Sequence, residues 1–198
     1  MKQDGTVHLI RTTDLVAFCR DVFTRAGLAA GDAQASADVL VAADVRGIPS
    51  HSVGRLWRYV NGLRSGLMLP NADPVTLLET PTSLVVDARG GMGAAVSVRV
   101  MAAVIEKARA SGTAFASVRD SNHFGIAGYY AMMALEHDML GIAMTNTAAL
   151  GVPTFCAHGN VRHQPPGLRR AGGQGEGLCT RHVHDGRNAR KDRSVRAG

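Results

Sequence analysis

The 198-residue sequence has few cysteines, few aromatic residues and no long apolar run, and these shortages exclude several classes of protein. No apolar stretch approaches the roughly 20 residues that a membrane-spanning helix needs, and the first residues lead into no signal-peptide segment. The cysteines, Cys19, Cys156 and Cys179, are odd in number and widely spaced, which favours reduced thiols over a disulfide framework. We therefore expect a soluble, cytoplasmic protein, and the apolar fraction of 45% permits a real core.

Two familiar binding motifs are incomplete. Residues 89–93, Arg-Gly-Gly-Met-Gly, lie between a predicted strand and a predicted helix, as a dinucleotide-binding loop would. Val96 stands where the third glycine of that motif would fall, so we interpret the segment as a flexible turn and not as a Rossmann site. Cys179, His182 and His184 lack a fourth ligand and a paired spacing, so we predict no metal site there.

The positive charge is confined to the last part of the chain. From residue 160 onward there are nine basic and three acidic residues, whereas residues 1–159 carry thirteen of each. The same part has no sustained apolar period and cannot bury enough apolar surface to offset chain entropy. We predict that residues 158–198 form a disordered basic tail.

This tail also carries the alternative to an enzyme, a protein that binds nucleic acid through the phosphates. The absence of interleaved aromatic residues and of any folded module in the tail argues against nucleic acid as a partner.

Apolar residues recur at helical spacing in the first third of the chain. The predicted helices cover residues 12–27, 31–47 and 52–63. Gly27 and Gly47 end the first two, as glycine commonly does. Residues 1–70 therefore read as an N-terminal helical subdomain.

After a linker at residues 70–74 the period changes, and strands alternate with helices. The predicted strands cover residues 75–78, 83–87, 113–118 and 141–145, and the predicted helices cover residues 94–110 and 127–135. This order predicts an α/β fold, with residues 71–157 as a second domain.

Residues 121–125, Ser-Asn-His-Phe-Gly, place an imidazole on the turn between a predicted strand and a predicted helix. Such turns often hold catalytic groups, because rigid elements fix them while they stay open to a ligand. His123 can exchange a proton near neutral pH. A turn histidine satisfied by local backbone groups is the alternative.

His51, Arg55 and Tyr59 are four residues apart, so on a helix they would lie along one face. Arg55 could grip a small carboxylic acid with two hydrogen bonds while His51 exchanges a proton. The alternative is a solvated polar face opposite the apolar side of the helix. Together with His123, two acid/base groups and one carboxylate clamp suit the interconversion of a carbonyl and an alcohol.

Residues 144–147, Met-Thr-Asn-Thr, end a predicted strand with amide and hydroxyl groups. These groups could hold a nicotinamide carboxamide or a ribose, and ordinary strand-end polar residues explain them equally well.

Three segments together resemble the type-2 malate/L-lactate dehydrogenase family, which also contains ureidoglycolate, sulfolactate and diketogulonate oxidoreductases. They are residues 46–56 (Arg-Gly-Ile-Pro-Ser-His-Ser-Val-Gly-Arg-Leu), residues 121–125 and residues 144–147, in the family's order and spacing. The likeness covers about residues 9–155. Ser52 departs from it, because the family usually has glycine after the histidine that His51 matches.

The resemblance implies an NAD- or NADP-dependent oxidoreductase that interconverts a 2-hydroxy acid and its 2-oxo acid, in a homodimer with a non-Rossmann α/β nucleotide-binding domain. It assigns acid/base roles to His51 and His123 and substrate binding to Arg55 and Tyr59. It places the cofactor-binding residues at Ser121, Gly125, Asn146 and Thr147.

The likeness ends near residue 155, although the family continues with a Gly-Thr-Asn-Pro segment. Residues 161–165 can be encoded GTT-CGG-CAC-CAA-CCC, and one base later these codons read Phe-Gly-Thr-Asn. The same shifted frame permits Ala-Phe-Ala-Ala-Pro over residues 167–171 and Ala-Phe-Val-Leu-Asp-Met-Ser over residues 177–183. We therefore hypothesise a frameshift between about residues 155 and 161, which would leave this chain an inactive fragment with an out-of-frame tail.

Overall fold

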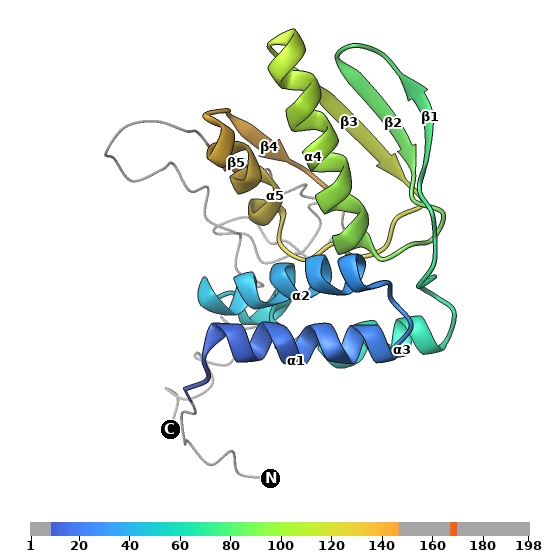
Figure 1. Cartoon of the computed structure of the whole chain (residues 1–198), viewed down its shortest axis with the longest axis vertical. Coiled ribbons are helices and arrows are strands. Elements are labelled where there is room, and N and C mark those ends of the chain that lie inside the picture. Colours follow the sequence, from blue (N-terminus) through green and yellow to red (C-terminus); the bar gives the residue numbers. More distant parts are fainter. Residues whose placement is uncertain (1–8, 147–166, 170–198) are drawn as a thin grey trace, which may run out of the picture. The chain divides into compact units, whose positions relative to one another are not determined.

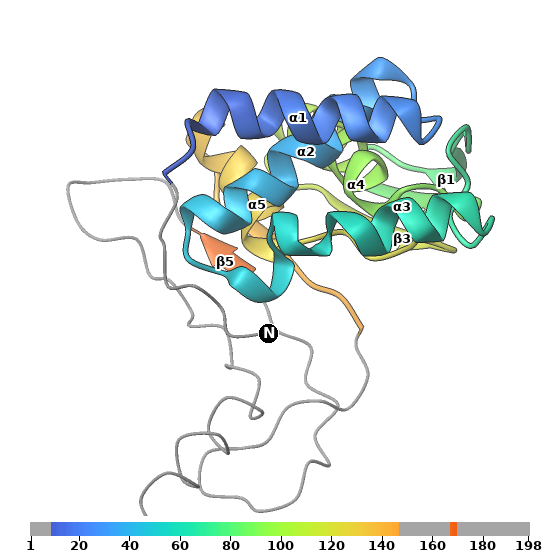
Figure 2. The same ribbon diagram turned by 90° about the horizontal axis from the view of Figure 1, so that it is seen from below.

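The computed structural model describes residues 9–146 and 167–169, and contacts between residues divide the chain into two compact units, residues 1–126 and 127–198. In the first unit three helices come first, α1 (Thr12–Arg25), α2 (Ala30–Val45) and α3 (Leu56–Arg64). α1 buries Cys19 and Phe23, which are one helical turn apart and therefore on one face. α2 lies against α1 and also against α4 (Gly93–Ser111), so it is buried on several sides (Figures 1 and 2). The predicted helical N-terminus is confirmed.

The third helix begins later than the sequence predicts. Two short 3₁₀ turns, η1 (Pro49–His51) and η2 (Val53–Arg55), come before α3. Ser52 between them is extended, with φ −85° and ψ −172°. The single helical stripe expected for His51, Arg55 and Tyr59 is therefore wrong, because the extended residue interrupts the helix between the first two.

Three strands and one helix complete the described part of the first unit. β1 (Val75–Glu79) pairs antiparallel with β2 (Ser83–Asp87), and β2 pairs parallel with β3 (Phe115–Arg119), in the order β1-β2-β3. α4 connects the two parallel strands and lies against the sheet (Figure 1). The mixed sheet with a crossover helix confirms the predicted α/β fold. Because α4 also contacts α2, the sheet and the N-terminal helices belong to the same unit.

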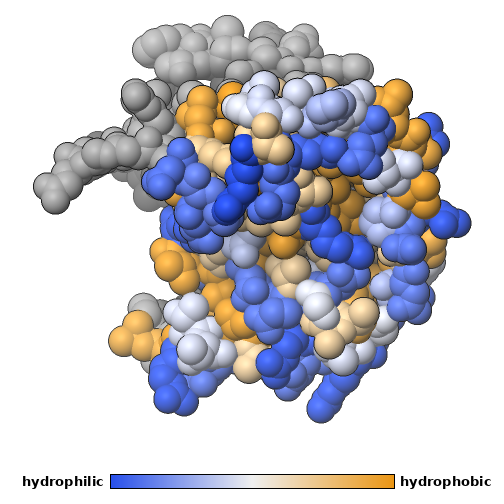
Figure 3. Space-filling model, turned by 45° about the horizontal axis from the view of Figure 1, so that its top comes forward, coloured by the Kyte–Doolittle hydropathy of each residue, from blue (hydrophilic) through white to orange (hydrophobic). Residues whose placement is uncertain are grey.

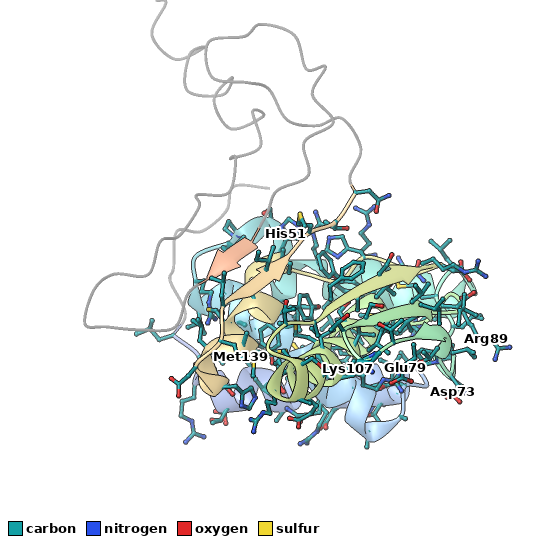
Figure 4. The ribbon with its side chains drawn as sticks, turned by 90° about the horizontal axis from the view of Figure 1, so that it is seen from above. His51, Asp73, Glu79, Arg89, Lys107 and Met139 are labelled. Atoms are coloured by element: carbon teal, nitrogen blue, oxygen red, sulfur yellow. The ribbon has the colours of Figure 1, made fainter. Side chains whose placement is uncertain are left out.

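α4 covers one face of this sheet. Leu84 and Val86 of β2 are buried, and Lys107 of α4 reaches the end of β1, with its Nζ 2.6 Å from Glu79 Oε1 (Figure 4). All five residues of β1 are exposed, as is Phe115 of β3. Hydrophobic residues are also visible among hydrophilic ones on the surface in Figure 3. This sheet therefore leaves apolar side chains in water.

The described part of the second unit contains α5 (Ala127–Met133), η3 (Ala134–His137), β4 (Gly141–Ala143) and β5 (Gly167–Arg169). β4 and β5 pair antiparallel. Gly141 lies so close to α5 that a Cβ on it would be 2.1 Å from the Ala131 carbonyl oxygen. Because β5 falls inside the predicted disordered tail, that expectation does not hold for residues 167–169, where backbone hydrogen bonds to β4 need no apolar period.

Of the cysteines, Cys19 is buried with a free thiol, while Cys156 and Cys179 lie outside the described residues, together with His182 and His184. No helix within residues 9–146 is long and apolar enough to cross a membrane.

Candidate active site

His123 lies in the loop that follows β3. Asp120 has a left-handed φ of 50° directly after the strand and turns the chain. Gly125 has a φ of +85°, and a Cβ on it would lie 2.4 Å from Cγ1 of Val39 in α2. Only glycine suits that position, and the loop can therefore lie tightly against α2.

Three side chains from residues 49–64 converge on the ring of His123. Tyr59 Oη lies 2.6 Å from Nδ1, and Arg55 Nη1 lies 3.4 Å from Nε2. His51 stacks on the ring, with the ring centroids 5.2 Å apart and the planes inclined by 25°. The four residues that were predicted to exchange protons and bind substrate thus form one group within the first unit, which we call the His123 cluster (His51, Arg55, Tyr59 and His123).

The partners of His123 indicate which nitrogen carries the proton. The backbone N–H of Gly125 donates to Nδ1 at 3.2 Å, so Nδ1 of the neutral ring is an acceptor and Nε2 carries hydrogen. Nε2 faces Arg55, whose guanidinium is also only a donor. In this tautomer both nitrogens of the 3.4 Å contact carry hydrogen, so an oxygen of a bound anion beside them could accept from both.

Burial and nearby positive charge keep His123 neutral. Burial, as the largest cause, and the positive charges of Arg55, His51 and Arg58 together lower the pKa of His123 to about 4. A bound carboxylate beside Arg55 would offset one of these charges. We therefore expect ligand binding to raise the pKa of His123.

Tyr59 is a buried phenol that keeps its proton. It is only 2% exposed and packs edge-on against Phe23, with ring centroids 6.2 Å apart. Burial raises the pKa of Tyr59 to about 12, against the opposing effect of Arg55 and Arg58. Its hydroxyl can donate to Nδ1 of neutral His123, or accept from Nδ1 when the ring is protonated.

The turns that carry His51 and Arg55 are held by hydrogen bonds between residues close in sequence. Ser52 Oγ donates to the Pro49 carbonyl at 3.1 Å and accepts from the Gly54 N–H at 3.3 Å. Arg55 Nε donates to the Ser50 carbonyl, and Ser50 Oγ lies 2.8 Å from Nδ1 of His51. Ser52 has a negative φ, so serine replaces the family's glycine without backbone strain.

The predicted cofactor-binding residues are only partly described. Ser121 is exposed in the His123 loop, and its Oγ makes a 3.4 Å bond to the next carbonyl. Gly125 contacts the ring of His123 through its N–H. Asn146 follows β4 in the second unit and is exposed, while Thr147 lies outside the described residues. The roles of all four remain predictions.

The glycine-rich turn before α4 uses its own N–H groups. Gly90 donates to the Asp120 carbonyl and Gly91 to the Ala88 carbonyl, both at 2.9 Å, and the Arg89 N–H donates to Asp87 Oδ1. These groups cannot also hold a phosphate, which agrees with the incomplete motif. Its tight turn, with φ of 50° at Arg89 and 72° at Gly90, is a structural connection.

Two residues near the site were not foreseen. The Asn122 side chain bonds to the glycine-rich turn, and Gly93 lies beneath the loop, where a Cβ would be 2.1 Å from the Asn122 carbonyl oxygen. No local pattern indicates either contact, because each joins segments about 30 residues apart. Within the described ranges no group of three or more histidine, cysteine or acidic side chains could hold a metal ion.

Several proteins of known function are similar to this chain in sequence. The family profile described as malate/L-lactate dehydrogenase matches residues 10–161. The malate dehydrogenase of Pyrococcus abyssi is 45% identical over 141 residues, which are 71% of this chain and 39% of that protein. The L-sulfolactate dehydrogenase of Methanocaldococcus jannaschii is 39% identical over 133 residues, 67% of this chain and 39% of that protein. The chain spans well under half the length of these curated relatives.

Solved structures share the fold. The malate dehydrogenase from Pyrococcus horikoshii OT3 has a TM-score of 0.78 at 37% identity, over 89% of this chain and 52% of that one. The sulfolactate dehydrogenase from Methanocaldococcus jannaschii has a TM-score of 0.84 at 30% identity, over 95% of this chain and 56% of that one. The resemblance predicted from the sequence motifs is confirmed, and the chain belongs to the malate/L-lactate dehydrogenase family, a family of oxidoreductases.

Proposed function

We propose that the His123 cluster is the acid/base and substrate-binding half of a site that interconverts a 2-hydroxy acid and its 2-oxo acid. The observation that supports this most directly is the proximity of Arg55 to His123, with Nη1 3.4 Å from Nε2. A 2-oxo acid carries a carboxylate and a neighbouring carbonyl oxygen, which suit a guanidinium and an imidazole N–H side by side.

In the direction of reduction, Arg55 holds the substrate carboxylate, and His123 gives a proton from Nε2 to the oxygen on C2. The ring takes up its second proton when substrate binds, before this step, so Nδ1 still carries a hydrogen afterwards and donates it to Tyr59 Oη, 2.6 Å away. His51, stacked on the same ring, is the second acid/base candidate. The carboxylate that Arg55 binds also raises the pKa of His123, so proton uptake accompanies substrate binding.

NAD or NADP is the cofactor that we propose, and its reduced form would supply the hydride for C2 when bound. The exposed hydroxyl of Ser121 and the amide of Asn146 suit the carboxamide and ribose, and Gly125 and Thr147 complete the set proposed from the resemblance. The turn at residues 89–91 does not suit the phosphates, because its N–H groups are already bonded. The phosphate contacts would come from elsewhere in a complete homodimeric enzyme.

We further propose that the chain is an inactive fragment, because the reading frame changes between residues 155 and 161. The family match runs to residue 161, where the shifted frame begins to spell Phe-Gly-Thr-Asn. The remaining part of the family's chain would then be absent as protein, although its codons persist.

The test compares the chain as it stands with a version whose frame is restored by removing one base between codons 155 and 161. We expect no NADH or NADPH oxidation by the present chain with pyruvate, oxaloacetate or related 2-oxo acids, and turnover by the restored enzyme. Arg55→Lys in the restored enzyme should mainly raise KM, and His123→Gln should mainly lower kcat.

Robust turnover by the present chain would refute the fragment proposal. A restored frame that opens no long family-like sequence would refute the frameshift. If the restored enzyme folds but oxidises NADH or NADPH with none of these acids, the proposed substrate class fails.

A further inference from the structure

The loop that carries His123 is anchored by the preceding residue. Asn122 Nδ2 donates to the Gly90 carbonyl at 2.8 Å and to the Gly91 carbonyl at 3.1 Å. The amide nitrogen has two hydrogens, and both are used on the same turn. A neutral side chain thus ties the loop after β3 to the turn after β2.

The turn that receives Asn122 is itself held from several sides. The Gly90 carbonyl also accepts from the Leu69 N–H at 2.8 Å, and the Gly90 N–H donates to the Asp120 carbonyl at 2.9 Å. Asp120 and Asn122 therefore bond to the same turn from positions two residues apart. This arrangement gives the loop a fixed base immediately before His123.

Beneath the same loop, α4 begins without a side chain at Gly93. A Cβ on Gly93 would lie 2.1 Å from the Asn122 carbonyl oxygen and 2.7 Å from the His123 carbonyl oxygen. The backbone that follows the Asn122 side chain, at the carbonyl groups of residues 122 and 123, is thus packed closely against the start of α4. The hydrogen bonds of the Asn122 side chain and this close packing both restrain residues 122 and 123.

We propose that Asn122 is a positioning residue, whose two hydrogen bonds to the Arg89–Gly91 turn hold the ring of His123 in register with Tyr59 and Arg55. A role of Asn122 in catalysis rests on the proposed function, but its effect on the position of the His123 ring can be measured without any turnover. The groups that face the ring are the Tyr59 hydroxyl, the guanidinium of Arg55, the imidazole of His51 and the Gly125 N–H, with Arg58 acting through its charge.

A released loop would change the surroundings of His123 in one direction. The ring would gain water and lose the donors at Nδ1, and it would move away from the positive charges. Each of these changes favours the protonated form, so the pKa of His123 would rise from about 4 toward its ordinary 6.5. A merely structural role would lower stability without moving this pKa.

The experiment measures the rate at which diethylpyrocarbonate modifies His123 in the full chain, from pH 5 to 8, by peptide mass spectrometry. The reagent attacks the neutral imidazole, so the pH profile reports the pKa. Asn122→Ala is compared with Asn122→Ser, which keeps one donor, and with Asn71→Ala. Asn71 is an exposed amide in the pocket on the outer side of the turn, which Asp73 and Arg89 also line (Figure 4).

We expect a slow and pH-independent rate in the unchanged chain and in Asn71→Ala. In Asn122→Ala the rate near pH 8 should rise severalfold and fall toward pH 5, with an intermediate profile in Asn122→Ser. Circular dichroism shows whether each variant folds. If Asn122→Ala does not fold, the profile of Asn122→Ser decides the question. A folded Asn122 variant with the profile of the unchanged chain would overturn the proposal, as would an equal shift in Asn71→Ala. Neither result depends on the restored-frame assay, so this inference can fail while the proposed function stands.

Discussion

The two compact units differ in how many of the predicted site residues they hold. The first unit holds the whole His123 cluster, whose hydrogen bonds and ring contacts join residues between 23 and 125. The second unit holds Asn146 and Thr147, two of the four proposed cofactor residues, next to the segment where the family match ends. All the residues proposed to transfer protons or bind substrate therefore lie in one unit, whereas the proposed cofactor residues are divided between the two.

The charge of the chain changes near the same place. Residues 1–159 are balanced in charge, and all of the net +6 comes from the remainder. The proposed shift in reading frame would account for this change in one step. If the first unit keeps the His123 cluster independently of the second, substitutions in the two units should have separate effects.

The largest effect is expected for Gly93→Ala in the first unit. The new methyl would lie 2.1 Å from the Asn122 carbonyl oxygen, so the backbone of α4 and that of the His123 loop must move apart. We expect the free energy of unfolding to fall by about 3 kcal/mol, as for overpacking at a rigid site. Urea unfolding followed by circular dichroism measures it.

Gly31→Ala is the matched control for that experiment. It lies in α2 with nothing within 4 Å of the new methyl, so we expect a gain of about 0.5–1 kcal/mol. A loss as large as that of Gly93→Ala would contradict the steric explanation.

Gly141→Ala repeats the same collision in the second unit, where the new methyl would lie 2.1 Å from the Ala131 carbonyl oxygen. We expect a loss of about 2 kcal/mol that hydrogen exchange locates in α5 and β4, because smaller units open locally. The diethylpyrocarbonate profile of His123 should stay unchanged. A changed profile would show that the cluster depends on the second unit.

The pH dependence of stability tests the neutral state of His123. Its folded pKa of about 4 lies below the ordinary 6.5, so the unfolded chain binds more protons between these values. Stability should therefore fall as pH drops from about 6.5 toward 4, by roughly 1–2 kcal/mol after allowing for partial solvent screening. Urea titrations at several pH values measure this slope, which His123→Gln should reduce.

Tyr59→Phe should have the smallest effect. It removes the hydroxyl from Nδ1 of His123 and leaves the ring packing with Phe23 in place. We expect a loss of about 1 kcal/mol and a higher pKa for His123, because a donor to the neutral ring is gone. If the pH profile of diethylpyrocarbonate modification of His123 stays unchanged in this variant, the phenol does not affect the protonation of His123.

Periodicity was enough to predict most elements of the fold. Cys19 and Phe23 recur at helical spacing and do line one face of α1, and Ser83–Asp87 forms a strand with the predicted bounds. These predictions succeed because local propensity and the side of burial are written in neighbouring residues. The start of α3 was mispredicted because four-residue spacing alone does not reveal the extended backbone at Ser52.

For the candidate site too, the sequence predicted some features and could not predict others. Motifs and family likeness were enough to name His51, Arg55, Tyr59 and His123, since each residue type carries its chemistry wherever it lies. Only the tertiary structure brought Tyr59 to Nδ1 and Arg55 to Nε2 across more than 60 residues, and tied Asn122 to Gly90. Distances across that much chain arise from packing of α2, α3 and α4, which no local pattern encodes. The sequence thus names the candidate residues, and the packing decides which nitrogen of His123 each of them meets.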